Sequence, residues 1–491
     1  MVLMSNLPQL IVLSLYLVDW ILRIIMIFIV PRNRKPSSAT AWLLLIMFLP
    51  FLGLIVFLLL GSPKLPKKRR DKQFKMNSLI KQTTDEATVD PKFAKLINFD
   101  IPIRYQPFVK LNQSLGGLPV FSGNLIQLSP NYNDTILMIA KDIDQANRYV
   151  HIEYFALAMD KTTEPIFIAI ENAVNRGVKV RVLFDTIGSH KYPFHKQMRA
   201  RLSNIGAEWH NVLPVKLPGR NFSRPDLRNH RKIVVIDSYI GYTGSQNLIQ
   251  RNYHRKDSLY YDELVARIKG PVVLQLNLAF ITDWYSETSV LLNHSTSPEI
   301  ITKTKSYGNT MAQILPSGPG FENDNNLKLF TGLIHAANKK IVITNPYFVP
   351  DGSVMTALTS AAQRGVDVTL INSEIMDQAL VGNAERSFYE ELLSAGVKIY
   401  WYHYPVLLHS KHMTIDDDIA TIGSSNFDMR SFQLDLEVTL VVYDKNVVKD
   451  LRKIEDNYMS KSKKVSYDKW RKRPIRTIFI ENIARLTSSL Q

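Results

Sequence analysis

The stretch LHSKHMTIDDDIATIGSSNF, Leu408 to Phe427, carries the pattern that decides the fold. A histidine and a lysine stand two residues apart before an apolar run. An aspartate follows the lysine after four residues, and Gly-Ser-x-Asn follows the aspartate after six. The same pattern at the same spacing occurs in NHRKIVVIDSYIGYTGSQNL, Asn229 to Leu248. At ~5% per residue type, six fixed identities arise by chance in such a chain at odds of about 10⁻⁵, so two copies indicate a duplication.

The pattern places a histidine and a lysine, whose burial costs free energy, on one face of a buried strand. Residues i and i+2 of a strand point to the same side, so the histidine and lysine of each copy should lie together. A buried lysine or histidine is costly unless it is paired. Two such pairs that meet would form a pocket for one phosphodiester, in which the lysines offset the charge that phosphorus gains in the transition state. The residues concerned are His230, Lys232, His409 and Lys411.

A wider repeat surrounds the two motifs. The phrases YVHIEYFALAMD and KIVITNPYFVPD each precede a helical stretch that ends in a glycine and leads into a new strand. Gly177 and Gly365 fit the left-handed position that ends a helix. We therefore predict an α/β fold of two pseudo-twofold-related lobes, residues 111–297 and 298–460, with mixed, mainly parallel sheets flanked by helices.

Length and composition set the remaining limits. The chain has 491 residues and a net charge of +16, which favours an anionic partner such as nucleic acid or an acidic membrane surface. It contains no cysteine, which excludes disulfides, zinc–thiolate sites and thiol nucleophiles. The sequence shows no cluster of metal ligands either, so we expect neither a metal nor a cofactor.

Two apolar runs near the N-terminus favour the membrane over nucleic acid. Leu7–Val30 and Ala41–Leu60 are each long enough to span a bilayer as a helix, and residues 1–62 are predicted to form a transmembrane helical hairpin. Asp19 and Arg23 lie inside the first run and should pair with each other. Three basic residues lie in the loop between the runs and seven follow the second, which places the N-terminus and the C-terminal body in the cytoplasm.

Three further segments are characterised by their charge. Residues 63–110 are polar and basic and should form a linker. Residues 461–491 begin densely basic and end in an amphipathic run, which fits a helix in the membrane interface or one that packs on the second lobe. A loop rich in proline and arginine precedes the first motif, and its candidates for a lipid phosphate are Arg220, Arg224 and Arg228.

The doubled motif resembles that of the phospholipase D superfamily, and the surrounding phrases resemble bacterial cardiolipin synthases. Those phrases include ITDWYSET, QILPSGPG, NPYFVPD and NFDMRSFQLDLEV. The resemblance implies that His230 is the nucleophile and His409 the general acid and base. It also implies that Asp237 and Asp416 hold the scaffold of the motif. Ser245, Asn247, Ser424 and Asn426 would add hydrogen-bond donors to the phosphate oxygens.

Each imidazole also needs a partner for its second nitrogen, commonly a carboxylate. Glu263 and Glu437 are the candidates, because they lie 33 and 28 residues after the histidines of their own lobes. The family has Arg-Asp where this chain has Asp262-Glu263, so either carboxylate could orient His230. We accordingly expect Glu437 to orient His409.

The resemblance implies a membrane-bound phosphatidyltransferase. It would move a phosphatidyl group from one phosphatidylglycerol to another through a phosphatidyl-histidine, giving cardiolipin and glycerol. The alternatives are a phospholipase D hydrolase, a transferase with another donor or acceptor such as phosphatidylethanolamine, a membrane-tethered nuclease, and a lipid-binding scaffold with an inactive site. The hairpin argues against the nuclease, and the two intact motifs argue against the scaffold.

Overall fold

The computed structural model describes residues 7–32, 34–62, 64–88, 96–97, 101–215, 224–253, 259–292 and 305–488. The chain divides into two compact units. The first comprises Met1–Lys64 with Lys216–Arg224, and the second comprises Leu65–Val215 with Pro225–Gln491. Apart from residues 216–224, both predicted lobes therefore belong to the second unit.

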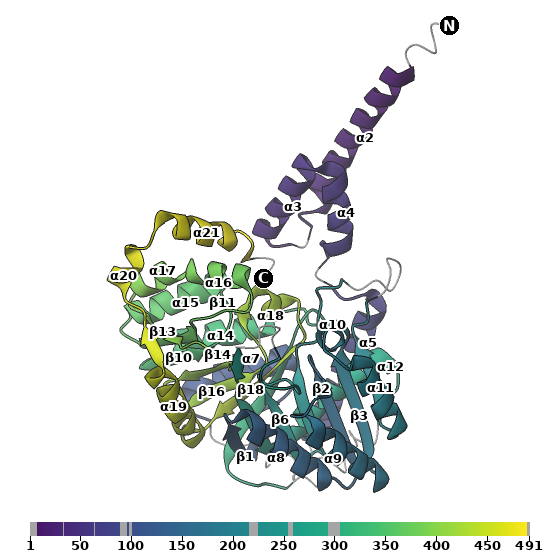
Figure 1. Cartoon of the computed structure of the whole chain (residues 1–491), viewed down its shortest axis with the longest axis vertical. Helices are drawn as coiled ribbons and strands as arrows, with labels where there is room; N and C mark the ends of the chain where they lie inside the picture. Colours follow the sequence, from purple (N-terminus) through teal and green to yellow (C-terminus); the bar gives the residue numbers. More distant parts are fainter. Residues whose placement is uncertain are drawn as a thin grey trace. The chain divides into compact units, whose positions relative to one another are not determined.

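The first unit contains three apolar helices, α2 (Leu7–Ile29), α3 (Pro36–Phe48) and α4 (Pro50–Leu60) (Figure 1). Within the described ranges, α2 is the one helix long and apolar enough to cross a membrane. The predicted pair of Asp19 and Arg23 is confirmed at 2.8 Å. The continuous second helix that we predicted is wrong, because Pro50 lacks an N–H and disfavours helical geometry at Leu49, whose φ and ψ are −133° and 70°.

The second unit is built on one sheet of 15 strands, in the order β19-β13-β12-β10-β15-β16-β18-β9-β1-β8-β6-β5-β2-β3-β4. The strands of the first lobe are β1 (Phe121–Ser129), β2 (Tyr149–Tyr154), β3 (Lys179–Asp185), β4 (Glu208–Val212), β5 (Lys232–Ile236), β6 (Ile240–Gly244) and β8 (Val265–Lys269). Those of the second are β9 (Thr310–Ser317), β10 (Lys340–Thr344), β12 (Asp367–Ser373), β13 (Lys398–Tyr402), β15 (His412–Ile415), β16 (Ile419–Gly423), β18 (Glu437–Tyr443) and β19 (Ser462–Lys464).

The strand order shows the repeat directly. Read outward from the centre, β1-β8-β6-β5-β2-β3-β4 matches β9-β18-β16-β15-β10-β12-β13, and β19 is added at one edge. The two halves join where β1 pairs antiparallel with β9. The mixed α/β sheet of two related lobes is confirmed. Its parallel pairs are fewer than we expected, because they are limited to β2-β3-β4 and β10-β12-β13 while the strands between them pair antiparallel.

Helices cover both faces of this sheet. Those of the first lobe are α8 (Tyr132–Asp144), α9 (Glu164–Asn175), α10 (Thr186–His190), α11 (His195–Asn204) and α12 (Val273–Thr288). Those of the second are α14 (Asn325–Ala336), α15 (Gly352–Gln363), α16 (Ala379–Arg386), α17 (Tyr389–Ser394), α18 (Met429–Gln433) and α19 (Lys445–Ser460). Gly177 and Gly365 end α9 and α15 with φ of 85° and 89°, as predicted.

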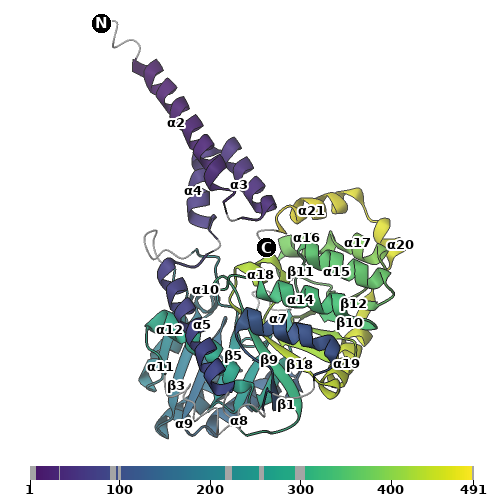
Figure 2. The ribbon, with the colours of Figure 1, turned by 180° about the vertical axis from the view of Figure 1, so that it is seen from behind.

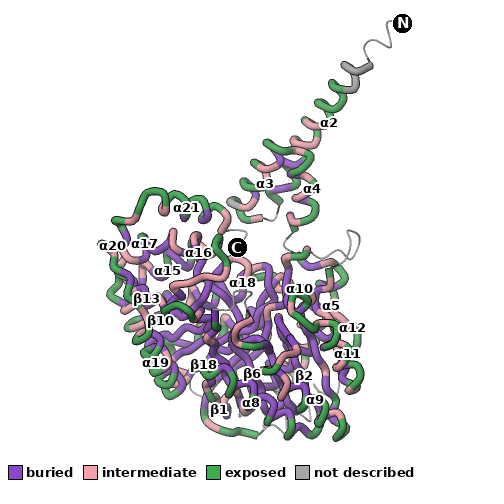
Figure 3. The backbone as a smooth tube through the Cα atoms, viewed as in Figure 1, coloured by how far each residue is buried: buried purple, intermediate pink, exposed green. Residues whose placement is uncertain are grey.

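The core is continuous between the lobes. Strands β5 and β15, which follow the two histidines, are buried along their whole lengths. The same is true of β2, β6 and β18 in the middle of the sheet (Figure 3). One apolar cluster contains Val273 and Leu276 of α12 together with Leu440 of β18. Because the lobes share this cluster, neither can separate without exposing it, and the two motifs are held at a fixed distance.

Part of the segment predicted as a linker, residues 67–88, is instead a helix that packs on the first lobe. Helix α5 (Lys67–Thr88) contacts α12, and α7 (Gln106–Gly116) contacts α14 (Figure 2). Arg69 of α5 is buried and forms ion pairs with Glu287 and Asp283. Lys72 Nζ donates to the Ser286 carbonyl oxygen at 2.8 Å, where the end of a helix favours positive charge. The basic character of this segment therefore serves the docking of α5.

The C-terminal segment packs on the second lobe. It contains α20 (Tyr467–Arg471) and α21 (Ile475–Arg485), and α21 contacts α16. Ala484 and Glu481 are buried on the inner side of α21, and Arg473 pairs with Glu481 at 2.6 Å. The outer side leaves large apolar residues exposed, namely Ile475, Phe479, Ile480, Ile483 and Leu486. The structure therefore agrees with one of our two interpretations, in which this segment packs on the second lobe.

Candidate functional site

Backbone pairing between the lobes positions both motif histidines. Strand β14 (Val406–Leu408) pairs parallel with β7 (Tyr260–Asp262), with Leu408 opposite Asp262. In the other half, Asn229 forms a parallel bridge with Leu436. The next residue in each case donates its backbone N–H across the boundary, His409 to the Asp262 oxygen at 2.7 Å and His230 to the Leu436 oxygen at 2.9 Å.

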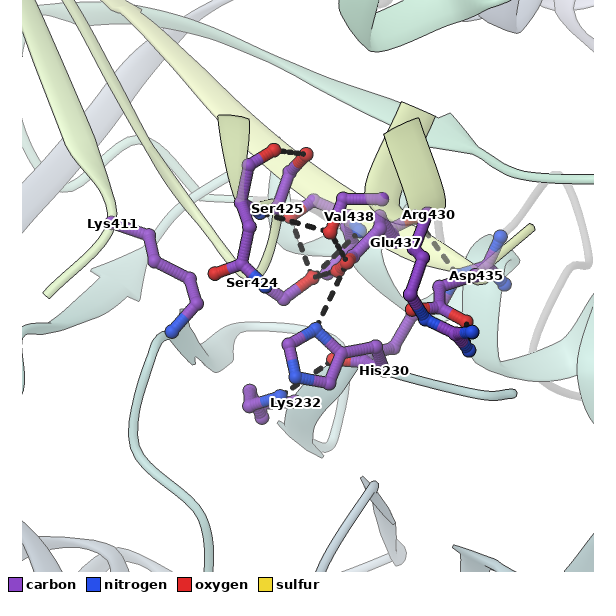
Figure 4. Close-up of polar contacts among 12 residues, drawn as sticks. His230, Lys232, Lys411, Ser424, Ser425, Arg430, Asp435, Glu437 and Val438 are labelled. Atoms are coloured by element: carbon purple, nitrogen blue, oxygen red, sulfur yellow. Dashed lines mark hydrogen bonds and ion pairs between the residues drawn. The ribbon is translucent and has the colours of Figure 1, made fainter. Parts of the chain in front are cut away.

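This register determines which carboxylate meets which histidine. The residues after Asp262 and Leu436 are Glu263 and Glu437, so each glutamate lies beside the histidine of the other lobe. His230 Nδ1 is 2.9 Å from Glu437 Oε1 (Figure 4). In the same way, His409 Nδ1 is 2.8 Å from Glu263 Oε1. The pairing within each lobe that we predicted is therefore wrong.

Asp262, the other candidate for orienting His230, has different partners. It accepts a hydrogen bond from the Tyr402 hydroxyl at 2.9 Å and pairs with Arg251. Its backbone carbonyl, described above, is its contact with the motif. Asp262 thus contributes to the site through its main chain, while Glu263 supplies the side chain.

Hydroxyl groups hold the glutamate of the second lobe. Glu437 accepts from the Ser431 hydroxyl at 2.8 Å and from the Ser424 hydroxyl. Burial raises the pKa of Glu437, but His230 and Lys232 lower it by more, and the net shift is downward. Glu437 therefore remains a carboxylate that can accept the Nδ1–H of His230.

The corresponding glutamate of the first lobe has a different electrostatic state. Burial raises the pKa of Glu263 to about 7, against the opposing effect of Lys411. The Ser245 hydroxyl accepts from the Leu264 backbone N–H at 3.0 Å and so fixes the chain beside Glu263. The two carboxylates, related by the repeat, thus differ in how strongly they hold their charge, which gives the two histidines different surroundings.

The two asparagines of the Gly-Ser-x-Asn turns differ in their contacts. Asn247 Oδ1 accepts from the Ala156 backbone N–H at 3.3 Å. Asn426 donates its backbone N–H to Ser431 Oγ at 3.1 Å, while its side-chain Oδ1 is buried without a hydrogen-bond partner. In this structure the side chains of Ser245, Asn247 and Ser424 therefore help to hold the site together.

The two lysines lie close to the histidines and to each other. Lys411 Nζ donates to His409 Nε2 at 2.9 Å, and Lys232 Nζ donates to the His230 carbonyl oxygen at 2.7 Å. Burial lowers the pKa of Lys232 to about 8, and burial together with the charge of Lys232 lowers the pKa of Lys411 to about 7. The four side chains meet in one buried site at the junction of the lobes.

Burial also favours the neutral form of both imidazoles. It lowers the pKa of His230, despite the opposing charge of Glu437. It lowers that of His409 well below the usual value, with further contributions from Lys411, Lys232 and His230. With Nδ1–H directed at a carboxylate, a neutral imidazole carries its lone pair on Nε2, where it can attack phosphorus or accept a proton.

The motif aspartates lie at the far ends of the strands and bind backbone. Asp237 accepts the N–H groups of residues 147, 148 and 149 at 2.8, 2.9 and 2.8 Å. Asp416 accepts those of residues 338, 339 and 340 at 3.2, 2.7 and 3.0 Å. Each carboxylate therefore joins the end of the histidine strand to the start of the neighbouring strand, away from the histidines.

This geometry gives a prediction about stability. Asp416→Ala should lower the free energy of unfolding by about 3 kcal/mol, because three backbone N–H groups lose the buried carboxylate that accepts their hydrogen bonds. Thermal unfolding of the detergent-solubilised protein measures the change. Asp144→Ala, at a position where the side chain is about half exposed, is the matched control and should change little. An Asp416→Ala protein with normal stability and no activity would contradict the scaffold role.

Sequence reasoning missed several aromatic residues around the histidines. Phe155 lies edge-on to His230 with ring centroids 5.2 Å apart, and Tyr261 and Tyr347 flank His409 at 5.6 and 6.0 Å. Asp377 accepts hydrogen bonds from both tyrosine hydroxyls, at 3.2 and 2.8 Å. Phe155 and Tyr347 belong to the repeated phrases YVHIEYFALAMD and KIVITNPYFVPD, but nothing in those phrases indicates a contact with the histidines.

A cavity of about 580 Å³ opens beside these tyrosines. Its lining includes Tyr253, Tyr261 and Asp377 on the His409 side, and Lys191 and Phe194 on the other. Since Tyr261 contacts both the cavity and His409, the cavity lies next to the reacting groups. It combines aromatic surface with a carboxylate, which suits a small polar group such as an alcohol.

The loop arginines that we predicted as phosphate ligands fare differently. Arg228 is buried and pairs with Asp185 at 3.2 Å, so it supports the chain before His230. Arg224 is half-buried, and Arg220 lies outside the described residues. No group of three or more metal-ligating side chains that could hold an ion occurs in the described parts of the chain.

The sequence matches known protein families and curated relatives. Residues 139–284 and 330–458 match the family described as cardiolipin synthase, PLD-like domain, and residues 21–62 match the one described as phospholipase D-nuclease N-terminal. The chain is 32% identical to cardiolipin synthase A of Pectobacterium atrosepticum over 465 residues, 94% of each chain. It is also 32% identical to cardiolipin synthase A of Yersinia pseudotuberculosis over 450 residues, 91% of each chain.

Among solved structures, the fold resembles that of phosphatidylserine synthase from Haemophilus influenzae. The TM-score is 0.60 at 15% identity, and the match covers 78% of this chain and all of that one. This likeness concerns the arrangement of strands and helices in the two lobes.

Proposed function

The chain belongs to the cardiolipin synthase family of the phospholipase D superfamily, and from that premise we propose how its residues transfer a phosphatidyl group. It is a phosphatidyltransferase that acts on phospholipids. The proposed donor and acceptor are two molecules of phosphatidylglycerol, and the products are cardiolipin and glycerol. The observation that carries the proposal is the pair of histidine–lysine sets held in one site by glutamates from opposite lobes.

In the first step, His230 Nε2 attacks the phosphorus of the donor and the bond from phosphorus to the headgroup oxygen breaks. His409 gives that oxygen a proton, and free glycerol leaves. The bound phosphodiester is an anion, so it raises the pKa of His409 and of both lysines from their values in the empty site. The phosphatidylated imidazole is positively charged, and the carboxylate of Glu437 at Nδ1 stabilises it.

In the second step, neutral His409 takes the proton of a terminal hydroxyl on a second phosphatidylglycerol. That oxygen attacks phosphorus, the bond to His230 breaks, and the phosphatidyl group moves to the acceptor. Lys232 and Lys411 offset the negative charge on the phosphate oxygens in both transition states. Water must be kept out, since it would give phosphatidic acid instead.

Product analysis tests this function. The protein is reconstituted with phosphatidylglycerol carrying a label in its headgroup glycerol, and the products are separated. We expect one released glycerol for each cardiolipin formed. Phosphatidic acid as the main product would instead show a hydrolase, and a product that requires phosphatidylethanolamine would show another donor or acceptor.

The lysine pKa values predict an early alkaline limit to activity. A lysine is charged below its pKa, and the values of about 8 for Lys232 and about 7 for Lys411 apply to the free enzyme, which kcat/KM reports. We expect kcat/KM to fall as the pH rises through about 7–8, because the uncharged site binds the phosphodiester weakly. A Lys232→Arg enzyme that retains activity should keep it to higher pH. A profile that stays flat to about pH 10 would contradict the prediction.

The cavity beside His409 is the proposed site for the acceptor headgroup, in which Asp377 would accept a hydrogen bond from a glycerol hydroxyl. Asp377→Asn should therefore lower the ratio of cardiolipin to phosphatidic acid about tenfold, the effect of one charge-assisted hydrogen bond. Measurement of both products from the same reaction gives this ratio. Asp367→Asn, at a position about 40% exposed in the same lobe, is the control. An unchanged ratio with a lower total rate would place the acceptor elsewhere.

The protein is associated with the membrane, and we propose that its catalytic body, residues 111–460, lies on the cytoplasmic side. The excess of basic residues after the apolar helices supports this orientation. The exposed apolar side of α21, with Arg476 and Arg485 nearby, would contact an anionic lipid surface. Residues 1–62 are the proposed anchor, 63–110 the lead-in and 461–491 the interfacial segment. We expect no nucleic-acid partner.

A further inference from the structure

The ends of the second apolar segment contact each other. Arg34, which precedes α3, donates a hydrogen bond to the carbonyl oxygen of Gly61, which follows α4. The Arg34 guanidinium also lies 4.8 Å from the centre of the Phe57 ring. A helix that crossed the bilayer would hold its two ends about 30 Å apart. The segment therefore starts and finishes at the same level.

The two helices are short and pack closely. Helix α3 has 13 residues and α4 has 11, about 20 Å and 16 Å, whereas the hydrocarbon core of a bilayer is about 30 Å thick. A Cβ atom at Gly53 would come within 2.9 Å of Ile46 Cα, so glycine is what lets the two backbones touch. Trp42 and Phe57 also meet edge-on with ring centroids 5.4 Å apart. The helices form an antiparallel pair about one leaflet deep.

The ion pair of Asp19 and Arg23 in α2 stabilises the turn between α3 and α4. Arg23 Nη1 donates to the Met47 carbonyl oxygen at 2.8 Å, close to the end of α3. The last carbonyls of a helix have no partner within it, and an unpaired carbonyl is costly in hydrocarbon because no water is present to donate a hydrogen bond. Asp19 holds Arg23 in place. A charge pair in an apolar helix is thus explained by a neighbouring helix that ends at the same depth.

The outer surface of the pair is apolar around the turn. The large side chains that are half exposed or more are Leu44, Phe48, Leu49, Phe51, Leu52, Ile55 and Leu58. Phe48 is 79% exposed and lies at the turn itself. Such a surface fits the acyl chains of a lipid leaflet, in which it would be buried.

We infer that α3 and α4 form a re-entrant hairpin that enters one leaflet and returns, so that α2 alone crosses the membrane. The N-terminus then lies on the side opposite the catalytic body, contrary to the two crossings that we expected from the sequence. No lysine or arginine precedes α2, so every basic residue near the membrane lies on the side of the body. The number of crossings does not depend on the proposed function, while the cytoplasmic side of the body does.

Single cysteines test this topology without background, because the full chain has none. One thiol is placed in an N-terminal extension, at Pro31→Cys in the turn after α2, or at Lys179→Cys on the exposed start of β3. Intact cells and permeabilised cells are treated with a membrane-impermeant maleimide. We expect Pro31→Cys and Lys179→Cys to label on the same side and the N-terminal thiol on the other. Any other distribution overturns the inference, and the side of Lys179→Cys separately tests the orientation of the body.

Cross-linking provides an independent test. A protein with Pro31→Cys and Ser62→Cys should be cross-linked within one chain by a short flexible bis-maleimide, because both positions flank the hairpin on the same side. The matched control, an N-terminal thiol with Ser62→Cys, should not be cross-linked. With two crossings the results would be reversed, since the N-terminus and residue 62 would then share a side.

Discussion

Replacing His230 by alanine should lower the rate of phosphatidyl transfer by at least about 10⁴-fold, because the atom that attacks phosphorus is lost. His409→Ala should cause a loss of about 10²–10⁴-fold, because the leaving oxygen loses its proton donor. Both rates are measured as cardiolipin formed from phosphatidylglycerol. His335→Ala, on an exposed part of α14, is the control and should retain full activity.

An activated donor distinguishes the two roles. In a phosphatidyl ester of p-nitrophenol, the leaving group is p-nitrophenolate. This anion is stable and needs no proton, so the first step no longer requires an acid. His409→Ala should therefore release one p-nitrophenol per protein in a first-turnover burst at a rate close to that of the unmodified protein, and then stop because the second step still lacks its base, while His230→Ala should show no burst. If His230→Ala is the variant that recovers, the nucleophile is His409. Recovery of both variants would mean that neither imidazole attacks phosphorus.

Much of the fold could be predicted because the chain repeats itself. The spacing of histidine, lysine, aspartate and glycine predicted two equivalent strands. The glycines that end helices predicted the strand–helix segments before those strands. The break in the second apolar run was also readable, since Pro50 stands in its middle and proline interrupts a helix. Its length and hydropathy outweighed that signal in our prediction. The docking of α5 could not be predicted, because its basic residues show no spacing that identifies Glu287 as a partner.

The crossed carboxylates were beyond sequence reasoning for a related reason. Glu437 is 207 residues from the histidine that it contacts, and Glu263 is 146 residues from its own. The candidates within each lobe lie far closer in sequence, and nothing in either motif indicates that a strand from the opposite lobe runs beside it. The pairing depends on the registers of Leu408 with Asp262 and of Asn229 with Leu436, which follow from how the lobes close on each other.

The contact of each histidine with a glutamate of the opposite lobe can be tested by measuring activity. Glu437→Gln and Glu263→Gln should each lower cardiolipin formation on the order of 10²–10⁴-fold, because a glutamine amide cannot stabilise a positively charged imidazole. Glu390→Gln, on the exposed side of α17, is the matched control and should change little. Each variant keeps the volume of the side chain, so the fold should be retained, and thermal unfolding checks this.

With the p-nitrophenyl donor the two glutamine variants should behave differently. Glu263 contacts His409, whose proton the activated donor does not need, so Glu263→Gln should recover most of the rate of its first-turnover burst of p-nitrophenol. Glu437 contacts His230, which must still attack phosphorus, so Glu437→Gln should stay impaired. Pairing within each lobe predicts the reverse, with recovery of Glu437→Gln. Each histidine therefore depends on a carboxylate from the opposite lobe, which explains why the two halves of the chain share one core and one site.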